Sequence, residues 1–578
     1  MKRALKFALI FSILSLILIA GAGFLTQKTK QSQAEAETTV PDEVEYITPS
    51  VVSENYIQKR IAKTLGKKTA PQPYSSKYQK AAEKVLAAYK KNEGYTLNNP
   101  LLIIDPYGTN RTGLYVYFKH DYKATVKYTV SLSATEDTPV ISGASIESDV
   151  SESDSGMTTK ARNFSADLFT NETNMPLTVI EGQIIGLVPG RKNYVSLRLY
   201  DENNRQIAKV GYRITLPSMK TVNRRLLEST YDRPVNQLSD GLYFVIGKNG
   251  KSNDILVYDN SGVIRADIPV LGSDYSQNVN IKTFDGKLFY AVNNRYYVAV
   301  NHLGRVTDIY DIGKNILSGS DFDLSATAQQ AVGIGSYNGG KTKNDLIVGI
   351  NIYNRKTTLL CDMRELLSDY YKKKGSKGSA SEPADWLGLN SISFINDDDV
   401  LVGCGKNSSI MRINDIFAKP KVAWLISPLD AYMGTKEGDY TLTAAGDNMA
   451  MSGQNNVRFD QYVNESTTKY YITMFNNNYT KGGSENSYFC KYLVDEDNRT
   501  YAPVTSIPSS YSAEGGSAEE TDGNFVIVAS AEPGEVTEFN AQGNRLAKFT
   551  LPKSDKNYRV VKRDMKGVWF AADRKVSE

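Results

Sequence analysis

Histidine and cysteine are scarce in this chain, with 2 histidines and 3 cysteines among 578 residues. His120 and His302 lie far apart in the sequence, and neither can form a catalytic triad or a metal site alone. Cys361, Cys404 and Cys490 are too few for a disulfide framework, although one bridge remains open. No Cys-x-x-Cys, His-Glu-x-x-His or glycine-rich phosphate loop occurs. We therefore expect neither a bound metal ion nor a cofactor.

Neither positive nor negative charge dominates the sequence, which contains 68 Lys and Arg residues and 64 Asp and Glu residues, for a formal net charge of +4. This balance gives no electrostatic case for binding DNA or RNA, so we expect no nucleic-acid partner. The acidic run Asp397-Asp398-Asp399 could suggest a calcium site. It lies between two strand-like segments, and we favour a solvated hairpin turn.

An uncharged apolar run over residues 7–25 follows the basic residues Lys2 and Arg3. Its length is close to the roughly 20 residues that span a bilayer. We favour an uncleaved membrane anchor over residues 1–26, although the small residues Ala20-Gly21-Ala22 leave a cleaved signal open. No cysteine follows the run closely, which excludes a lipid-anchored lipoprotein. The protein is expected to be extracytoplasmic, anchored to the cell membrane or secreted if the signal is cleaved, with a polar tether over residues 27–75.

Residues 76–95 are expected to contain a helix, because apolar residues recur there at helical spacing with lysines opposite. Such a helix could lie on a membrane surface or pack on the first domain. We favour the second, because the apolar face is modest. The apolar positions are Tyr78, Ala81, Ala82, Val85, Leu86 and Tyr89.

The pattern changes to a period of two over residues 96–220. Residues 113–118, 124–130, 194–199 and 208–214 alternate apolar and polar side chains, and Asn203-Asn204 marks a hairpin turn between the last two. These short antiparallel strands predict an N-terminal β-sandwich.

A longer repeat occupies residues 225–578, with about six units spaced on the order of 45–60 residues apart. Each unit has a strand, a loop and a second strand that ends in a turn rich in Asp, Asn and Gly, as at residues 257–263 and 300–306. Units arranged in a ring protect their sheet edges from solvent. The sequence therefore predicts an all-β fold: an N-terminal β-sandwich followed by a six-bladed β-propeller, preceded by a membrane-anchoring helix.

Residues 385–414, beginning with Asp385-Trp386-Leu387, closely resemble a signature of the bacterial arylsulfate sulfotransferases. Weaker matches occur in order along the chain, at residues 99–109, 186–194, 362–367 and 515–519. The resemblance implies transfer of a sulfuryl group from a phenolic sulfate ester to a phenol, without a nucleotide donor. It also implies a site in the propeller channel, where a histidine attacks sulfur and a cation binds the sulfate.

The catalytic residues of that family are mostly absent here. By this resemblance, the histidine that follows Asp-Trp-Leu is replaced by Gly388, and the arginine at the end of the following strand by Lys406. Asn407 stands where the family has a histidine beside that arginine. The nucleophile motif Gly-Gln-His corresponds to Gly453-Gln454-Asn455. An earlier His-Asp pair aligns with Phe322-Asp323. An asparagine amide cannot attack sulfur, so the family mechanism is not available.

A binding site could survive this loss. Lys406 keeps the positive charge, although not the two-pronged geometry of arginine, and with Asn390, Gln454 and Asn455 it could hold an anion or a phenol-like ligand. The alternative for Lys406 is a solvated lysine at the end of a strand. Cys404 is expected on the same side as Lys406, where the ammonium group would favour a thiolate nucleophile, but a buried structural cysteine is the more common role.

Three functions remain open. The first is a catalytically degenerate family member that binds a small phenolic, sulfated or other anionic ligand in the propeller channel. The second is an active sulfotransferase with a rearranged site. The third is a structural propeller that presents loops to other molecules. The scarcity of histidine favours the first and third.

Overall fold

The computed structural model describes residues 44–133, 163–219, 225–248, 252–271, 280–376, 378–428, 430–446, 451–480, 483–553 and 555–573. The anchor predicted over residues 1–26 lies outside these ranges. None of the helices within them is long and apolar enough to cross a membrane.

The N-terminal strands form one eight-stranded sheet with the order β1-β8-β7-β4-β3-β2, and β5 and β6 pair with β4. The first half of β4 pairs with β3 and β6, and its second half pairs with β5 and β7. One core cluster contains side chains of both halves, including Val116 and Val126. A β-sandwich has two separate sheets, whereas β4 joins both halves in one sheet here. The β-sandwich therefore stays a prediction. The strands are β1 (Tyr46–Ile47), β2 (Val51–Val52), β3 (Leu101–Ile104), β4 (Leu114–Ser131), β5 (Phe164–Asp167), β6 (Leu177–Ile184), β7 (Lys192–Tyr200) and β8 (Gln206–Thr215).

Two helices cover one side of this sheet. Helix α3 (Ser76–Lys90) buries the face expected from its apolar spacing against the side chains of β3 and β4. Helix α2 (Glu54–Thr64) begins at Ser53, whose side chain accepts a hydrogen bond from the backbone N–H of Tyr56, and it buries Ile57 and Ile61 one turn apart. The polar tether predicted over residues 27–75 is therefore too long, since that range includes α2. The sequence does not predict this helix because its few apolar positions lie among charged residues.

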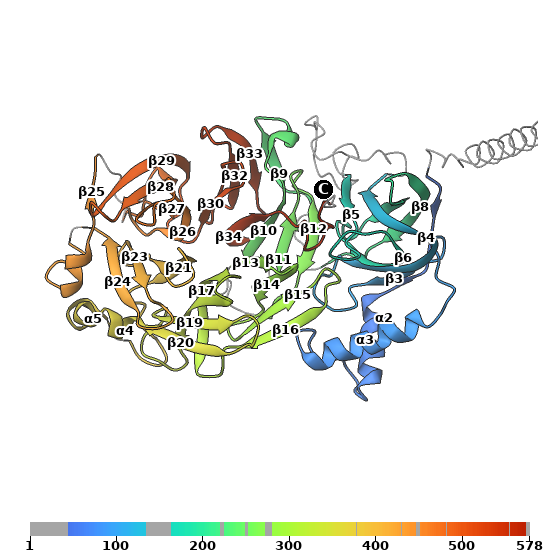
Figure 1. Cartoon of the computed structure of the whole chain (residues 1–578), viewed down its shortest axis with the longest axis horizontal. Helices are drawn as coiled ribbons and strands as arrows, with labels where there is room; N and C mark the ends of the chain where they lie inside the picture. The colour runs from blue at the N-terminus through green and yellow to red at the C-terminus, as the bar shows by residue number, and fades with distance from the viewer. Residues whose placement is uncertain are drawn as a thin grey trace, which may run out of the picture.

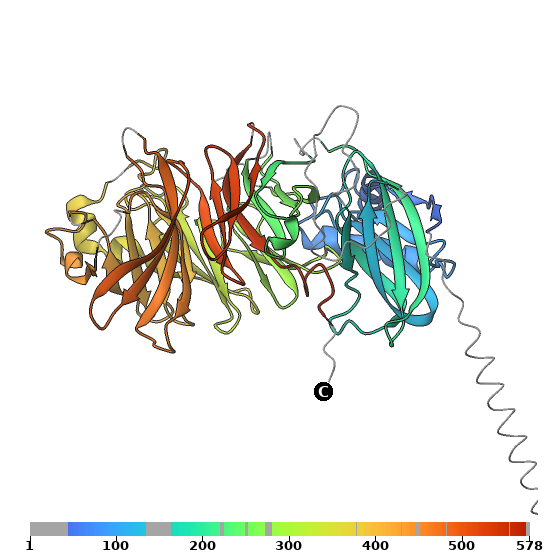
Figure 2. The same cartoon turned by 90° about the horizontal axis from the view of Figure 1, so that it is seen from above.

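Residues 228–563 form six sheets of four or five strands around a common centre, so the predicted six-bladed propeller is confirmed (Figure 1). The N-terminal sheet lies beside the ring (Figure 2). The first three blades contain β34 (Lys556–Arg563), β10 (Leu242–Lys248), β11 (Ile255–Tyr258) and β12 (Ile264–Ile268); β13 (Ile281–Phe284), β14 (Lys287–Ala291), β15 (Tyr296–Val300) and β16 (Val306–Asp311); and β17 (Ile316–Ser325), β18 (Gln330–Tyr337), β19 (Leu346–Asn351) and β20 (Thr357–Asp362).

The last three blades follow the same order from the centre outward. They contain β21 (Leu389–Phe394), β22 (Val400–Cys404), β23 (Ser409–Asn414) and β24 (Lys421–Ile426); β26 (Asn455–Tyr462), β27 (Lys469–Asn476), β28 (Asn486–Asp495), β29 (Thr500–Ser510) and β25 (Thr443–Ala444); and β30 (Ser517–Thr521), β31 (Phe525–Ser530), β32 (Glu535–Phe539), β33 (Arg545–Thr550) and β9 (Glu228–Tyr231). Short helices α4 (Met363–Leu366), α5 (Ser368–Lys374), η1 (Val235–Gln237) and η2 (Lys436–Tyr440) lie in the connections.

The ring closes where β34, the last strand in the sequence, becomes the innermost strand of the first blade by pairing with β10. A buried ion pair lies at this seam: the Lys562 Nζ is 2.8 Å from the Glu538 Oε2 on the sixth blade. The same ammonium donates to the Ser239 carbonyl at 2.7 Å, and the Tyr243 hydroxyl donates to Glu538. Burial lowers the pKa of Lys562 to about 8.

We expect Lys562→Met to lower the free energy of unfolding by about 3–5 kcal/mol, because Glu538 would keep a buried charge without its partner. The measurement is guanidinium unfolding at pH 7. The matched control is Lys548→Met, whose pair with Glu535 is partly exposed and should contribute about 0–1 kcal/mol. Equal losses in the two variants would contradict the role of the seam pair.

The loop between β3 and β4 joins the N-terminal sheet to the propeller. The Arg111 Nη1 lies 2.6 Å from the Asp254 carboxylate and 3.1 Å from that of Asp267. Asp105 organises the loop, because its Oδ1 accepts the backbone N–H groups of Thr109 and Asn110 at 2.9 and 3.1 Å. Its Oδ2 is buried without a partner among the described residues. Burial, and then the neighbouring Glu54, raise the pKa of Asp105 to about 7.

Because the folded state binds the Asp105 proton more tightly than the unfolded state, the free energy of unfolding should fall as the pH rises from about 4 to about 7. We expect Asp105→Asn to leave the melting temperature unchanged near pH 4 and to raise it at pH 8. The amide keeps the acceptor for the two N–H groups. Thermal unfolding across this pH range tests it, with the exposed Asp121→Asn as control. A difference in melting temperature between Asp105→Asn and the unchanged protein that is the same at every pH would contradict the raised pKa.

Candidate functional site

Ionised side chains from three blades meet at the centre of the propeller. Asp321 on β17 accepts hydrogen bonds from Arg458 on β26 at 2.7 and 3.1 Å and from Arg559 on β34. The backbone N–H of Ile392 on β21 donates to the same carboxylate at 3.0 Å. Although burial alone would raise the pKa of Asp321, the two guanidinium groups outweigh it and hold the pKa below its usual value.

Two further pairs belong to this central network, Lys282–Asp323 at 2.6 Å and Arg563–Glu519 at 2.8 Å. The network of innermost-strand residues thus contains four cationic and three anionic side chains. Asp323 lies in the network, whereas Phe322, which aligns with a family histidine, lies in the apolar core between the second and third blades. The Nε and Nη2 of Arg559 are buried without a partner among the described residues.

Gly388 directly precedes β21, the innermost strand of the fourth blade. We call this end of the ring the mouth, and it also carries the β22–β23 turn and the start of β26. Its φ of +68° is in the left-handed region, and its carbonyl accepts the backbone N–H of Gly405 at 2.8 Å. A Cβ at this position would lie 2.6 Å from the Lys406 Cγ and 2.9 Å from the Lys406 N. Backbone conformation and close packing both favour glycine here, so the space that a family histidine would need is already filled.

The structure brings the predicted ligand residues together, but two of them have other partners. The Asn390 Nδ2 donates to the Gln454 carbonyl at 2.8 Å. The Gln454 side chain is buried, and its Nε2 donates to the Ser409 carbonyl at 2.6 Å and the Cys404 carbonyl at 3.3 Å. The Gln454 amide thus joins the segment that precedes β26 to the ends of β22 and β23, and the Asn390 amide joins that segment to β21.

Lys406 lies in that turn and not at the end of a strand, since β22 ends at Cys404. Its side chain is exposed, and its ammonium group forms no ion pair with a described residue. Lys343 and Lys406 both lower the pKa of Asp385, although burial dominates and raises it. Asn455 is buried beside Tyr558, and a hydrogen bond from Asn455 partly offsets the rise that burial causes in the pKa of the phenol. Ammonium, carboxyl, amide and phenol groups therefore meet at the mouth.

Neither histidine supplies an imidazole to this mouth. His302 stacks on Phe169 with ring centroids 4.3 Å apart, between the propeller and the N-terminal sheet. It is half-buried, and burial lowers its pKa to about 4, so the prediction of a solvent-exposed turn residue is wrong. His120 lies on β4, where its ring contacts Tyr122.

Cys404 points into the apolar core of the fourth blade, and burial raises the pKa of its thiol to about 12. The favoured role of a buried structural cysteine is therefore confirmed, and the alternative of a thiolate nucleophile is wrong, because the thiol is buried and β22 ends between Cys404 and Lys406. All three cysteines are free and buried. No cluster of metal ligands occurs in the described part of the chain.

The acidic run is only partly a solvated turn. Asp397 and Asp398 are exposed, but Asp399 is buried and pairs with the Arg412 Nη2 at 2.6 Å. Asp399 thus stabilises the fourth blade through a partner that sequence proximity does not reveal.

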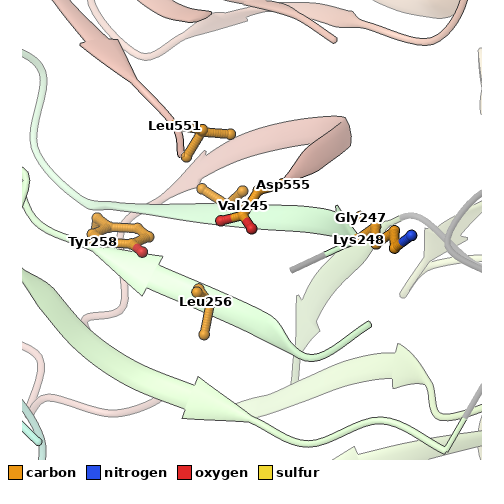
Figure 3. Close-up of a pocket in the computed structure, with 7 residues that line it drawn as sticks. All are labelled: Val245, Gly247, Lys248, Leu256, Tyr258, Leu551 and Asp555. Carbon is orange, nitrogen blue, oxygen red and sulfur yellow. The ribbon is translucent and has the colours of Figure 1, made fainter. Parts of the chain in front are cut away.

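A shallow hollow of about 240 Å³, which includes open solvent, lies between the first and sixth blades (Figure 3). Val245, Leu256, Tyr258 and Leu551 line it, with Lys248 and Asp555 beside them. It contains none of the predicted site residues.

The packing at Gly388 predicts that Gly388→Ala lowers the free energy of unfolding by more than the about 1–2 kcal/mol expected from a left-handed alanine alone. The excess comes from contact with the Lys406 backbone. Gly313→Ala is the matched control, because Gly313 has φ +88° and nothing within 4 Å of its added Cβ. Equal losses in chemical denaturation would show that the contact adds nothing.

Comparison with solved structures gives only distant likenesses. A putative 6-phosphogluconolactonase from Bacteroides fragilis shares 12% identity, with 64% of this chain and 94% of that chain covered and a TM-score of 0.33. A streptogramin B lyase shares 10% identity, with 56% and 88% covered and a TM-score of 0.32. These values carry no argument about function. No curated protein matches the sequence.

The arylsulfotransferase (ASST) family model matches residues 229–565, which is more than half of the chain and the whole ring of blades. The matched range includes Gly388, Lys406 and Asn455. This protein belongs to the arylsulfotransferase family.

Proposed function

We propose that this family member has lost sulfuryl transfer and binds a small anionic ligand, phenolic or sulfated, at the mouth of the propeller channel. The observation that carries the proposal is the exposed Lys406 ammonium group, which has no ion-pair partner among the described residues and faces a mouth without an imidazole.

The loss of catalysis is supported by what occupies the positions aligned with family histidines. The amide of Asn455 is neither a nucleophile toward sulfur nor a proton carrier at neutral pH. Gly388 is packed against Lys406, which leaves no room for a larger residue without rearrangement. Cys404, the alternative nucleophile, is buried and stays protonated because burial raises its pKa to about 12.

Ligand binding is supported by the groups that remain free to act. Lys406 supplies a point charge for a sulfate or carboxylate, and Tyr558 is half-buried next to Asn455. Asn390 and Gln454 would support the site by fixing the loops and would not contact the ligand, because their amides are engaged with the backbone. A lysine binds an oxyanion without the bidentate geometry of arginine, so a moderate affinity is expected.

We further propose that residues 1–26 anchor the protein, so that the propeller meets its ligand outside the cytoplasm. The basic and apolar order of residues 2–25 supports this placement.

The proposed function predicts that 4-nitrophenyl sulfate binds without release of nitrophenol, with or without a phenol acceptor. We expect Lys406→Ala to weaken binding about tenfold, which is about 1.4 kcal/mol, and Lys406→Arg to retain it. Calorimetry measures the affinity and absorbance measures turnover. Lys419→Ala is the control, since Lys419 is exposed in the same blade beyond the other end of β23.

Two outcomes would overturn the proposal. Acceptor-dependent nitrophenol release that disappears in Lys406→Ala would identify an active transferase with a rearranged site. A folded protein that neither binds nor cleaves the ester would favour a propeller that only presents loops.

A further inference from the structure

We infer that the mouth binds an oligosaccharide that carries several sulfate groups, and this inference rests on the proposed anion site at Lys406. Two observations lead to it: exposed lysines on the third and fourth blades, and two tyrosines that lie next to them. A ligand with a single sulfate would use only one of these lysines.

The lysine row comes from the loop between β18 and β19. Lys341 and Lys343 are exposed, and Thr342 between them is buried, so both lysines project from the same side of an extended segment. Backbone hydrogen bonds of 3.0 Å from Lys343 to Ala384 and from Ala384 to Lys341 fix this segment beside Asp385. Neither lysine forms an ion pair with a described residue.

Lys406 extends the row from the next blade. Lys406 packs against Gly388, three residues beyond Asp385, since a Cβ on Gly388 would lie 2.6 Å from the Lys406 Cγ. In agreement with this placement, Lys343 and Lys406 both lower the pKa of Asp385, although burial dominates and raises it. That carboxyl is partly withdrawn from solvent, and its Oδ2 accepts the Asn344 amide at 3.1 Å. Even with Asp385 and the neighbouring Glu382 ionised, the three lysines leave an excess of positive charge. The repeated cations call for a ligand with repeated anions.

Aromatic and amide groups lie next to the Lys406 turn. The backbone N–H of Gly453 donates to the Ser408 Oγ at 3.0 Å, which joins these groups to the Lys406 turn. A Cβ on Gly453 would lie 3.3 Å from the Tyr479 Cβ, and the Tyr479 side chain is 52% exposed. Tyr558 lies beside Asn455 at the start of the innermost strands. Tyrosine rings offer an apolar face with a polar tip, which suits the faces and hydroxyl groups of sugars.

The test uses the full chain and three probes: chondroitin sulfate tetrasaccharide, the same tetrasaccharide without sulfates, and 4-nitrophenyl sulfate. We expect the sulfated tetrasaccharide to bind at least about tenfold more tightly than either other probe. The double variant Lys341→Ala/Lys343→Ala should weaken tetrasaccharide binding about tenfold and change nitrophenyl sulfate binding less than about twofold. Tyr479→Ala should weaken tetrasaccharide binding alone. The matched control is Lys59→Ala/Lys63→Ala, which removes two exposed lysines from α2.

Equal affinity for the sulfated tetrasaccharide and nitrophenyl sulfate would overturn this inference and leave the proposed function intact. An equal loss of tetrasaccharide affinity in the two double variants would also overturn it, because the ligand would then be attracted by the positive charge of the whole protein surface. Tetrasaccharide binding that depends on Lys341, Lys343 and Lys406, without any binding of nitrophenyl sulfate, would support the inference while removing phenolic esters from the proposed function. A folded protein that binds none of the probes would overturn both.

Discussion

The pairing of buried charges at the centre of the ring is the constraint on which the rest of the structure depends. Asp321 comes from the third blade, and its partners Arg458 and Arg559 come from the fifth blade and from the strand that closes the first. An unpaired ion at this depth would cost several kcal/mol. The blades must therefore close in one register, which the second buried pair, Lys562–Glu538, fixes at the seam.

This constraint also bears on where the proposed ligand would bind. Most polar groups of the central network bind one another, apart from the buried Nε and Nη2 of Arg559, whereas Lys406 is exposed at the mouth. There the loops are fixed by Asn390, Ser408 and Gln454, which leaves Lys406 exposed on a defined turn. A fixed turn loses little conformational entropy when a ligand binds, which favours the proposed binding at Lys406.

The sequence predicts the repeating blades and the helix near residue 80 well, because both depend on local periodicity. It does not predict the central network, since Asp321 lies 137 residues from Arg458 and 238 from Arg559, and only ring closure brings them together. The candidate site is intermediate. The family resemblance predicts Gly388, Lys406 and Asn455 as site positions. It does not predict that the Asn390 and Gln454 amides donate to backbone carbonyls. The expected exposure of His302 is wrong because its turn packs on the N-terminal sheet.

Gly388 and Asn455, the two positions where the family resemblance predicts a histidine, differ in their backbone, and this difference bears on whether a histidine would fit there. Asn455 begins β26 with an ordinary backbone and pairs with Phe475 of β27, although the register shifts directly after it, between Asn455 and Arg458, where Asn456 has a φ of +54°. At Gly388 the backbone itself has a left-handed φ, and its carbonyl bonds to Gly405, so a histidine there would move the Lys406 turn. That turn carries Lys406, the cation of the proposed anion site. A histidine at Gly388 would therefore displace that proposed site, so anion binding and histidine chemistry would compete for the same loop.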